Sequence, residues 1–326
     1  MPAGDLRRMR FVVSAVDIRV MESGNSPTPV YGYAFPRLSN HYFNMTLIVH
    51  ERDVYHGCTI RPSGSPWVRV QSATRGKFHL PQDNLFRGKE KLVYDYTPGG
   101  AVGLHSDRLT RYWLYRMGYP VNENEFILAK VNAGGAMVRE EVEPVANDFL
   151  NRVFEDGSQG ELYRIDDEWW FTDSWSQPSL SASWVYKGTD NPGRYRSEWM
   201  KRTRENEDDY SALVSFFKKV SGTYTQSEIE RLIDPVATMK IWAIRGYIGD
   251  WDSFSMNRGK NSYFYRRPTD GVFMFFHWDS DLAFQSGYRN SAFYNGASEG
   301  MKGIRPYIEQ PYNLRLFKHF LATLVE

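Results

Sequence analysis

A group of oxygen-bearing side chains between residues 250 and 281 has the residue types needed for metal chemistry. They are Asp250, Asp252, Asn257, Asn261, Asp279 and Asp281. Carboxylate and amide oxygens are the ligands that hard divalent cations such as Mg²⁺ prefer in proteins. Asp and Asn are also common in solvated turns and helix caps. Two acidic pairs that each follow an apolar segment favour a metal site over that alternative, and phosphoryl transfer requires such ligands.

The elements expected around these side chains would bring them together. Residues 262–266 and 272–277 are apolar and aromatic-rich segments separated by a polar turn, and they predict a β-hairpin. Asn261 stands before the first strand and Asp279 follows the second, so the two should be near neighbours. Asp252 follows an apolar helical pattern and should lie close to both.

The order of these residues is that of a phosphotransferase. In protein kinases a catalytic-loop Asp, a downstream Asn and a second Asp after a hairpin orient the nucleophile and hold the metal. On this pattern Asp252 would be the catalytic base and Asp279 the principal metal ligand. Either Asn257 or Asn261 would be a further ligand, and Asp281 could assist as a second carboxylate.

The remaining patterns predict an α+β, two-lobed protein-kinase-like fold. A strand-rich N-terminal lobe would span residues 1–143, and a mainly helical C-terminal lobe would span residues 144–326. Strand patterns occur at 11–20, 42–50, 54–61, 67–70, 77–80, 91–94, 126–131 and 136–142. Helices are expected after the N-cap candidates Ser106 and Asp234. Residues 155–205 are irregular, or an insertion with some strand.

Composition excludes several classes of protein. The formal net charge of +1 gives no general attraction to nucleic acid. The single cysteine, Cys58, excludes an internal disulfide framework, and the seven histidines show no zinc-binding spacing. No apolar run is long enough to predict a membrane-spanning helix, and residues 1–10 lack a signal-peptide pattern. We expect the chain to be a domain of a longer protein.

Several segments resemble the signature of the CotH kinase family, the spore coat protein H-like kinases. The motifs are Gly-Asp-Trp-Asp-Ser-Phe at 249–254, Asn-Ser-Tyr-Phe-Tyr at 261–265 and Phe-His-Trp-Asp-Ser-Asp-Leu-Ala-Phe at 276–284. Thr-Ile-Arg-Pro-Ser-Gly-Ser at 59–65 resembles the family's Arg-Gly-Asn-Ser stretch. Residues 138–145, 149–152 and 162–164 resemble its Glu-Pro, Phe-Leu and Leu-Tyr-Lys run. The resemblance covers roughly residues 45–325.

The resemblance implies an atypical protein kinase of the group that phosphorylates spore coat proteins. It gives Asp252 the catalytic role and Asp279 the metal-binding role. Asn257 keeps the ordinary kinase interval from Asp252, but Asn261 keeps the family's position before the aromatic strand and is favoured. The glycine expected after the second family Asp is absent, since Phe-Gln-Ser-Gly stands at 284–287. That departure leaves catalytic activity open.

Three further residues are candidates for contact with a nucleotide. Lys77 lies on a predicted strand that matches the family's basic strand, where an ammonium could pair with phosphates. Arg61, beside a Gly/Ser turn, is a second candidate for phosphate contact. An exposed strand lysine and a turn-stabilising arginine are the alternatives. Glu143 falls where a kinase hinge would hold adenine, and we interpret it as marking the boundary between the lobes.

The leading hypothesis is therefore a kinase that uses ATP with Mg²⁺ or Mn²⁺ and phosphorylates Ser or Thr of a protein. The second hypothesis is a catalytically silent pseudokinase that acts as an interaction module of a coat or cell-surface protein. A third is a metal-dependent glycosyltransferase or hydrolase, which the lack of a parallel βαβ pattern disfavours. No Walker loop, nucleophile elbow or Rossmann fingerprint occurs in the sequence.

Overall fold

The structure is a computed structural model with a mixed α and β architecture. It describes residues 5–23, 39–64, 75–95, 101–166, 182, 184–250, 253–254, 260–284 and 305–325. The chain divides into two compact units, each with its own hydrophobic core. The first unit comprises Met1–Pro98 and Asn122–Pro144, and the second comprises Gly99–Val121 and Val145–Glu326. The helical segment 99–121 therefore belongs to the second unit, although it precedes residue 143.

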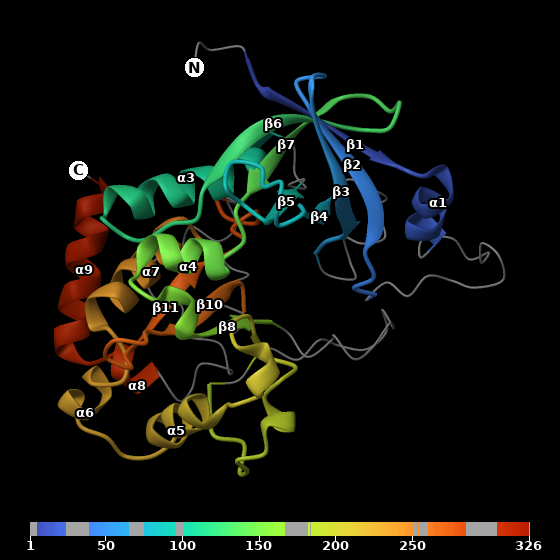
Figure 1. Ribbon diagram of the computed structural model, residues 1–326. Helices are drawn as coiled ribbons and strands as arrows, with labels where there is room; N and C mark the ends of the chain where they lie inside the picture. Colours follow the sequence, from blue (N-terminus) through green and yellow to red (C-terminus); the bar gives the residue numbers. More distant parts are fainter. Residues whose placement is uncertain are drawn as a thin grey trace. The chain divides into compact units, whose positions relative to one another are not determined.

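In its described residues the first unit is a closed β-barrel accompanied by the helix α1 (Figure 1). Its strand order is β1-β2-β3-β4-β5-β7-β6, and a parallel pairing of β1 with β6 closes it. The elements are β1 (Arg7–Val13), α1 (Ala15–Ser23), β2 (Phe43–Val49), β3 (Asp53–Pro62), β4 (Gly76–His79), β5 (Lys91–Asp95), β6 (Asn124–Val131) and β7 (Met137–Val142). The sequence predicted a strand-rich region here but not its closure into a barrel.

Alternating side chains fill the barrel interior. Phe11, Phe78 and Tyr94 are almost completely buried, and the ring of Phe11 stacks on Tyr94 with 4.5 Å between centroids. Cys58 is also buried in this core. Because successive strand residues point to opposite faces, residues next to these core positions face away from the interior.

The predicted strand at 11–20 is wrong in its second half. The strand β1 ends at Val13 and the helix α1 begins at Ala15. The Ser14 hydroxyl accepts a hydrogen bond from the Asp17 backbone N–H at 3.0 Å, and the Ser14 carbonyl accepts one from Ile18 at 3.0 Å. A local serine bond of this kind starts a helix, and it outweighs the strand preference of the β-branched residues that follow.

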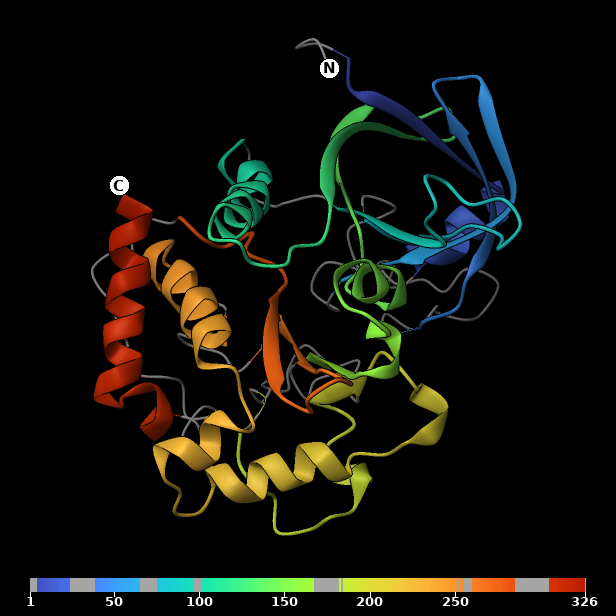
Figure 2. The same cartoon turned by 60° about the vertical axis from the view of Figure 1, so that its left-hand side comes forward.

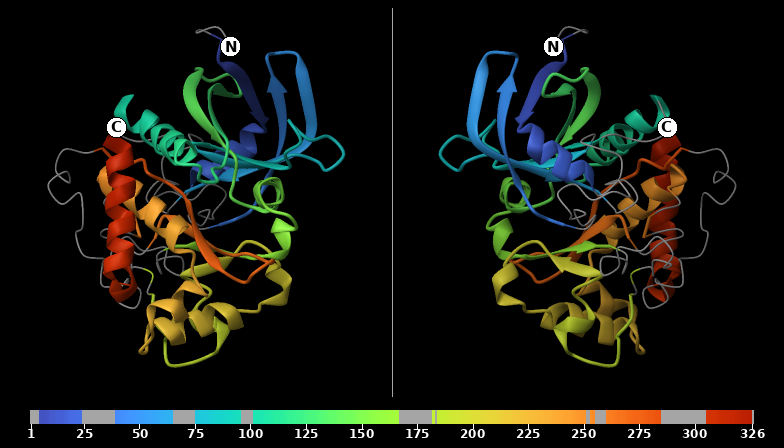
Figure 3. Two further views of the ribbon diagram at one scale, coloured as in Figure 1. Left: turned by 90° about the vertical axis from the view of Figure 1, so that its left-hand side faces the viewer. Right: turned by 90° about the vertical axis from the view of Figure 1, so that its right-hand side faces the viewer.

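The second unit combines helices with a four-stranded antiparallel sheet, in the order β11-β10-β8-β9. Its α-helices and strands are α3 (Ala101–Arg116), α4 (Asn147–Val153), β8 (Glu161–Ile165), β9 (Trp199–Lys201), α5 (Ser211–Val220), α6 (Gln226–Glu230), α7 (Pro235–Tyr247), β10 (Ser262–Arg266), β11 (Phe273–His277), α8 (Arg305–Ile308) and α9 (Pro311–Val325). Single 3₁₀ turns lie at Gly157–Gln159, Pro192–Arg194 and Glu205–Glu207. Helix α9 packs along α7, red and orange in Figures 2 and 3.

Two predicted helix starts in this unit had different outcomes. Asp234 caps α7, because its carboxylate accepts a hydrogen bond from the Ala237 backbone N–H at 2.9 Å, and Pro235 takes the first helical position. Ser106 does not cap α3, which begins at Ala101. Ser106 lies inside the helix, and its carbonyl accepts a bond from the Thr110 hydroxyl at 2.8 Å. No helix in the described part of the chain is long and apolar enough to cross a lipid bilayer.

Candidate functional site

The β10–β11 hairpin brings two of the predicted site residues to one end of the sheet in the second unit. Ser262 pairs with His277 in the hairpin register, so Asn261 immediately precedes the pair and Asp279 follows it by two residues. A single guanidinium joins the two strand ends, since Nη2 of Arg245 donates to the carbonyl oxygens of Asn261 at 2.6 Å and Trp278 at 2.5 Å. The expectation that the two hairpin ends meet is confirmed.

Arg245 also connects the hairpin to the first acidic loop. Its Nη1 donates to the Asp250 carboxylate at 2.6 Å, and both side chains are almost fully buried, at 0% and 1% exposure. A buried charge is tolerated only when it is paired and hydrogen-bonded, and the planar fork of arginine can serve several acceptors at once. Asp250 is therefore held next to the two ends of the β10–β11 hairpin.

A buried histidine continues this cluster. Nη2 of Arg245 lies 3.0 Å from Nδ1 of His277, and because arginine can only donate, Nδ1 must be the acceptor. The other ring nitrogen, Nε2, then carries the proton and donates to Asp107 at 3.1 Å. Burial and the charge on Arg245 lower the pKa of His277 to about 3, which keeps the ring neutral.

Asp107 of α3 anchors the loop between Asp279 and Asp281. Its carboxylate accepts hydrogen bonds from both the backbone N–H and the hydroxyl of Ser280, each at 2.8 Å. Burial opposes ionisation of Asp107, but Arg111, His277 and Ser280 together hold the pKa of its carboxyl below the ordinary value. The loop backbone is thereby fixed on both sides of Ser280.

Asp279 itself is half-buried, and no hydrogen bond to its carboxylate occurs within the described ranges. Burial opposes the charge on Arg164, but Asp166, Tyr263 and Asp279 raise the pKa of that guanidinium. Both Asn261 and Asp279 have left-handed backbones, with φ of 57° and 55°. Asn and Asp tolerate this conformation better than most residues, so their identities also suit the local chain path.

The other predicted ligands are only partly placed. Asp252 and Asn257 lie outside the described residues. Asp281 is half-buried in the turn that follows Ser280. Among the residues that the structure describes, no group of three or more His, Cys, Asp or Glu side chains is arranged to hold a metal ion.

The predicted phosphate-binding residues are neighbours on the barrel of the first unit. Arg61 of β3 and Lys77 of β4 are directly paired in the strand register. Ile60 and Phe78, beside them in sequence, are core residues, so Arg61 and Lys77 point to the opposite face. We call Arg61, Lys77, Lys91 and His79 the cationic face.

The pKa of His79 responds to the positive charges of the cationic face. Burial, followed by the charges of Lys77, Lys91 and Arg61, lowers the pKa of His79 to about 4. The His79 ring also contacts the Tyr42 hydroxyl, with 3.0 Å between Nε2 and the oxygen. The part of this depression that comes from the three cations also favours the binding of an anion at the same face.

Arg61 is held by its surroundings while one donor stays available. Its guanidinium lies over the Tyr42 ring, 5.4 Å from the centroid, and Nη1 donates to the Pro62 carbonyl at 2.8 Å. Nε is buried and makes no hydrogen bond within the described part of the chain. A buried donor without an acceptor lowers its free energy when a ligand oxygen accepts its hydrogen bond.

Glu143 has a different role from the other candidates. Its carboxylate is 3% exposed, accepts a hydrogen bond from Lys89 Nζ at 2.7 Å and accepts another from the Glu123 backbone N–H at 2.9 Å. The Asn122 side chain donates to the Glu143 carbonyl at 2.6 Å. These contacts fix the two chain segments that lead into and out of the β6–β7 hairpin.

Sequence reasoning did not identify Arg245 or Asp107. The available signal for Arg245 was a cation near the end of an apolar helical run, directly before an acidic segment. No comparable signal marks Asp107, which acts on residues about 170 positions away in the chain.

Comparison with known proteins agrees with the motifs in the hairpin region. The family model described as CotH kinase protein matches residues 106–323, and the chain belongs to this family. Among solved structures, the chain is similar to a proinflammatory kinase, CtkA, from Helicobacter pylori, with 10% sequence identity and a TM-score of 0.30. That match covers 64% of this chain and spans 55% of the other. No curated protein sequence matches the chain.

Proposed function

We propose that the chain is a two-lobed protein-kinase-like domain that binds ATP with Mg²⁺ or Mn²⁺ and transfers the γ-phosphate to Ser or Thr of a protein. Membership of the CotH kinase family supports the reaction class. The observation that carries the proposal is the clasp formed by Arg245, which joins Asp250 to the two ends of the β10–β11 hairpin. Phosphoryl transfer depends chiefly on such positioning, because it asks little covalent chemistry of the protein.

We assign the metal ligands to the hairpin end. Asp279 is the principal ligand and Asn261 the second, in preference to Asn257, and Asp281 assists. The donor set fits a hard cation, since it consists of carboxylate and amide oxygens, and the Asp279 carboxylate is half-buried and accepts no hydrogen bond among the described residues. A bound divalent ion supplies neutralisation of phosphate charge. Asp252 is assigned as the base that orients the substrate hydroxyl.

We assign phosphate contacts to Lys77 and Arg61 of the cationic face. Besides burial, the charges of Lys77, Lys91 and Arg61 each lower the pKa of His79, and this shared effect on one residue supports the assignment. We assign no chemical contact to the Glu143 carboxylate, since Lys89 and the Glu123 backbone engage it. Glu143 instead stabilises the chain next to the connection between the two units.

The test is nucleotide binding and turnover in three variants. The native chain should gain thermal stability with Mg-ATP, by about 2.7 kcal/mol at a ligand concentration a hundred times Kd. Asp279→Ala should lose most of that gain, whereas Asp252→Ala should keep it and lose phosphoryl transfer by about a hundredfold or more. Asp270→Ala is the matched control, because Asp270 lies in the turn at the other end of the same hairpin and pairs with Arg267. Full activity in both site variants would overturn the assignments.

A non-catalytic interaction module is the second candidate function, for a coat or cell-surface protein. It is favoured by the absence of the glycine expected after the second family Asp, since Phe-Gln-Ser-Gly stands at 284–287. A module of this kind would show a thermal shift with nucleotide, or none, but no ATP consumption with any protein acceptor. A glycosyltransferase is not supported, because the described strands pair antiparallel except for β1 with β6, and they form no parallel βαβ sheet.

A further inference from the structure

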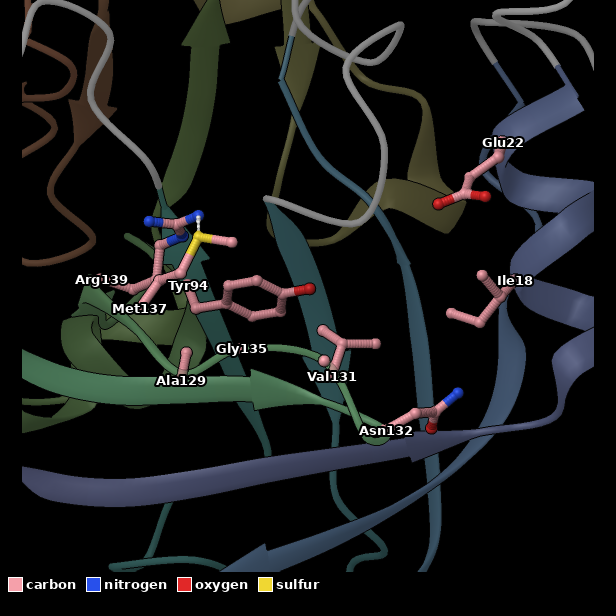
Figure 4. Close-up of a pocket in the computed structure, with 10 residues that line it drawn as sticks. Ile18, Glu22, Tyr94, Ala129, Val131, Asn132, Gly135, Met137 and Arg139 are labelled. Carbon is pink, nitrogen blue, oxygen red and sulfur yellow. Dashed lines mark hydrogen bonds between the residues drawn. The ribbon is translucent and has the colours of Figure 1, made fainter.

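A cavity of about 300 Å³ opens at one end of the β-barrel in the first unit (Figure 4). Its walls include Ile18 and Glu22 from α1, Tyr94 from β5, Val131 from β6 and Arg139 from β7. Figure 4 shows the Tyr94 hydroxyl and the Glu22 carboxylate directed toward the same space from opposite sides. The mouths of β-barrels are among the places where small-molecule sites form most often.

The strand register places this cavity inside the barrel. Arg139 pairs with Ile127 and Met137 pairs with Ala129. Ile127 is completely buried in the barrel core, so its partner Arg139 shares the interior face. Lys77 is adjacent to the core residue Phe78 and therefore faces outward. The cavity and the cationic face lie on opposite sides of the barrel wall.

Arg139 gives the cavity its polar specificity. The side chain is 6% exposed, its Nη1 donates to the Val138 carbonyl at 2.9 Å, and its Nη2 donates to the thioether sulfur of Met137 at 2.9 Å. Thioether sulfur is a weak acceptor, so an anionic oxygen that replaced it would form a much stronger, charge-assisted bond. Burial increases the gain, because a guanidinium with little access to water interacts more strongly with an opposite charge.

The remaining walls define the rest of the ligand. The Tyr94 ring is a flat wall, and Ile18, Ala129 and Val131 provide apolar contacts. The side chain of Asn132 is already used, since it bonds both the N–H and the carbonyl of Val13 at 2.8 and 2.9 Å. Glu22 is half-buried and can accept a hydrogen bond from an amine or hydroxyl.

We propose that the barrel mouth binds a small aromatic anion that also carries a hydrogen-bond donor. Its ring packs beside Tyr94, its carboxylate or sulfonate bonds Arg139, and its donor group reaches Glu22. A cavity of about 300 Å³ is at the lower end of the range for small-molecule sites, so one or two fused rings fill it. This site lies within the first unit and does not depend on phosphoryl transfer.

The experiment is a fluorescence titration of the full chain with 5-aminonaphthalene-1-sulfonate, which is an anionic aromatic amine with two fused rings. Native protein should enhance its emission with saturation at one site, and L-tryptophan should compete. Ala129→Leu fills the cavity and should weaken binding at least tenfold while leaving the protein folded. Arg139→Met should also weaken binding about tenfold, because it removes the anion's partner. Glu22→Gln should weaken it less.

Control variants distinguish binding of the probe in this cavity from binding elsewhere on the protein. Val138→Leu alters the neighbouring residue on the outer face of β7 and should leave binding unchanged. Val131→Phe narrows the mouth of the cavity without entering the packed core, and it replaces Ala129→Leu if that variant unfolds. Asp279→Ala should bind the probe normally even if no kinase activity is found. Unchanged binding in both cavity variants, or displacement of the probe by Mg-ATP, would overturn the proposal.

Discussion

The two units of the molecule use charged side chains in opposite ways. In the second unit, Arg245 and Asp250 are buried together and meet at 2.6 Å. In the first unit, burial and, after it, the charges of Lys77, Lys91 and Arg61 lower the pKa of His79 to about 4. One cluster joins opposite charges out of contact with water, and the other gathers positive charges at a half-buried surface.

The two charge arrangements suit different tasks, since the first can position chain segments and the second can bind a ligand. Oppositely charged groups in the interior hold one geometry, because any displacement leaves a charge without its partner. Like charges at a surface raise the free energy of the empty protein slightly, and a bound anion recovers that free energy. We therefore expect changes in the Arg245 cluster to affect folding, and changes in the cationic face to affect ligand affinity.

The largest effect is expected for Arg245→Met. This change leaves the Asp250 carboxylate buried without its cation and frees the carbonyls of Asn261 and Trp278. Removing one partner of a buried pair costs about 3–5 kcal/mol, so the free energy of unfolding should fall by that amount in urea titrations. Arg245→Lys keeps the charge but cannot reach all the acceptors, and it should lose less stability.

Two further variants test whether the cost comes from an unpaired charge. The double variant Arg245→Met, Asp250→Leu removes both charges and should recover part of the lost stability. Arg266→Met is the control, because Arg266 is 41% exposed and lies 3.5 Å from Glu161, a pair expected to contribute about 1 kcal/mol or less. A loss below about 1 kcal/mol in Arg245→Met would show that the clasp does not position the loops.

A smaller effect, on affinity rather than folding, is expected for Lys77→Met and Arg61→Met. Each should weaken nucleotide binding about tenfold, measured by calorimetry at low salt, with little change in unfolding free energy. Lys130→Met is the matched control, since Lys130 is a half-buried lysine on another strand of the same barrel. If all three lysine and arginine variants bind nucleotide equally, the cationic face is not the phosphate site.

Local signals explain which parts of the fold could be predicted from the sequence. The β10–β11 hairpin and the Asp234 cap depend on residues close together in the chain, and both were predicted correctly. Closure of the barrel depends on pairing β1 with β6, for example Met9 with Ala129, and no local pattern specifies that contact. The strands β8 and β9 lie in the range 155–205, where the sequence allowed an insertion with some strand but did not locate either one.

The candidate site shows the same division. The hairpin signal predicted that Asn261 and Asp279 would adjoin, because only the ends of one hairpin had to meet. It did not predict that both residues have left-handed backbones, nor that Asp107 would anchor the intervening loop from α3. The sequence predicted the spacing of the candidate site residues. It did not predict the buried side chains that position them.

The smallest effect is expected for the pH dependence of the first unit. The pKa of His79 is about 4 in the folded chain and about 6.5 when unfolded, so the unfolded form takes up the proton first as the pH falls. Stability should be flat above pH 6.5 and decline between pH 6.5 and about 4. The full shift corresponds to at most about 3 kcal/mol, and solvent screening of a half-buried ring reduces it to about 1 kcal/mol.

His79→Gln should remove this decline from urea titrations repeated across the pH range. Nuclear magnetic resonance of the His79 imidazole tests the cationic face more directly. Inorganic phosphate bound to this face would offset the charges of Lys77, Lys91 and Arg61. Phosphate should therefore raise the pKa of His79 toward 6.5, and Lys77→Met should raise it without phosphate. A pKa of His79 that neither phosphate nor this variant moves would show that burial alone sets it, and the first unit would then hold no anion site at this face.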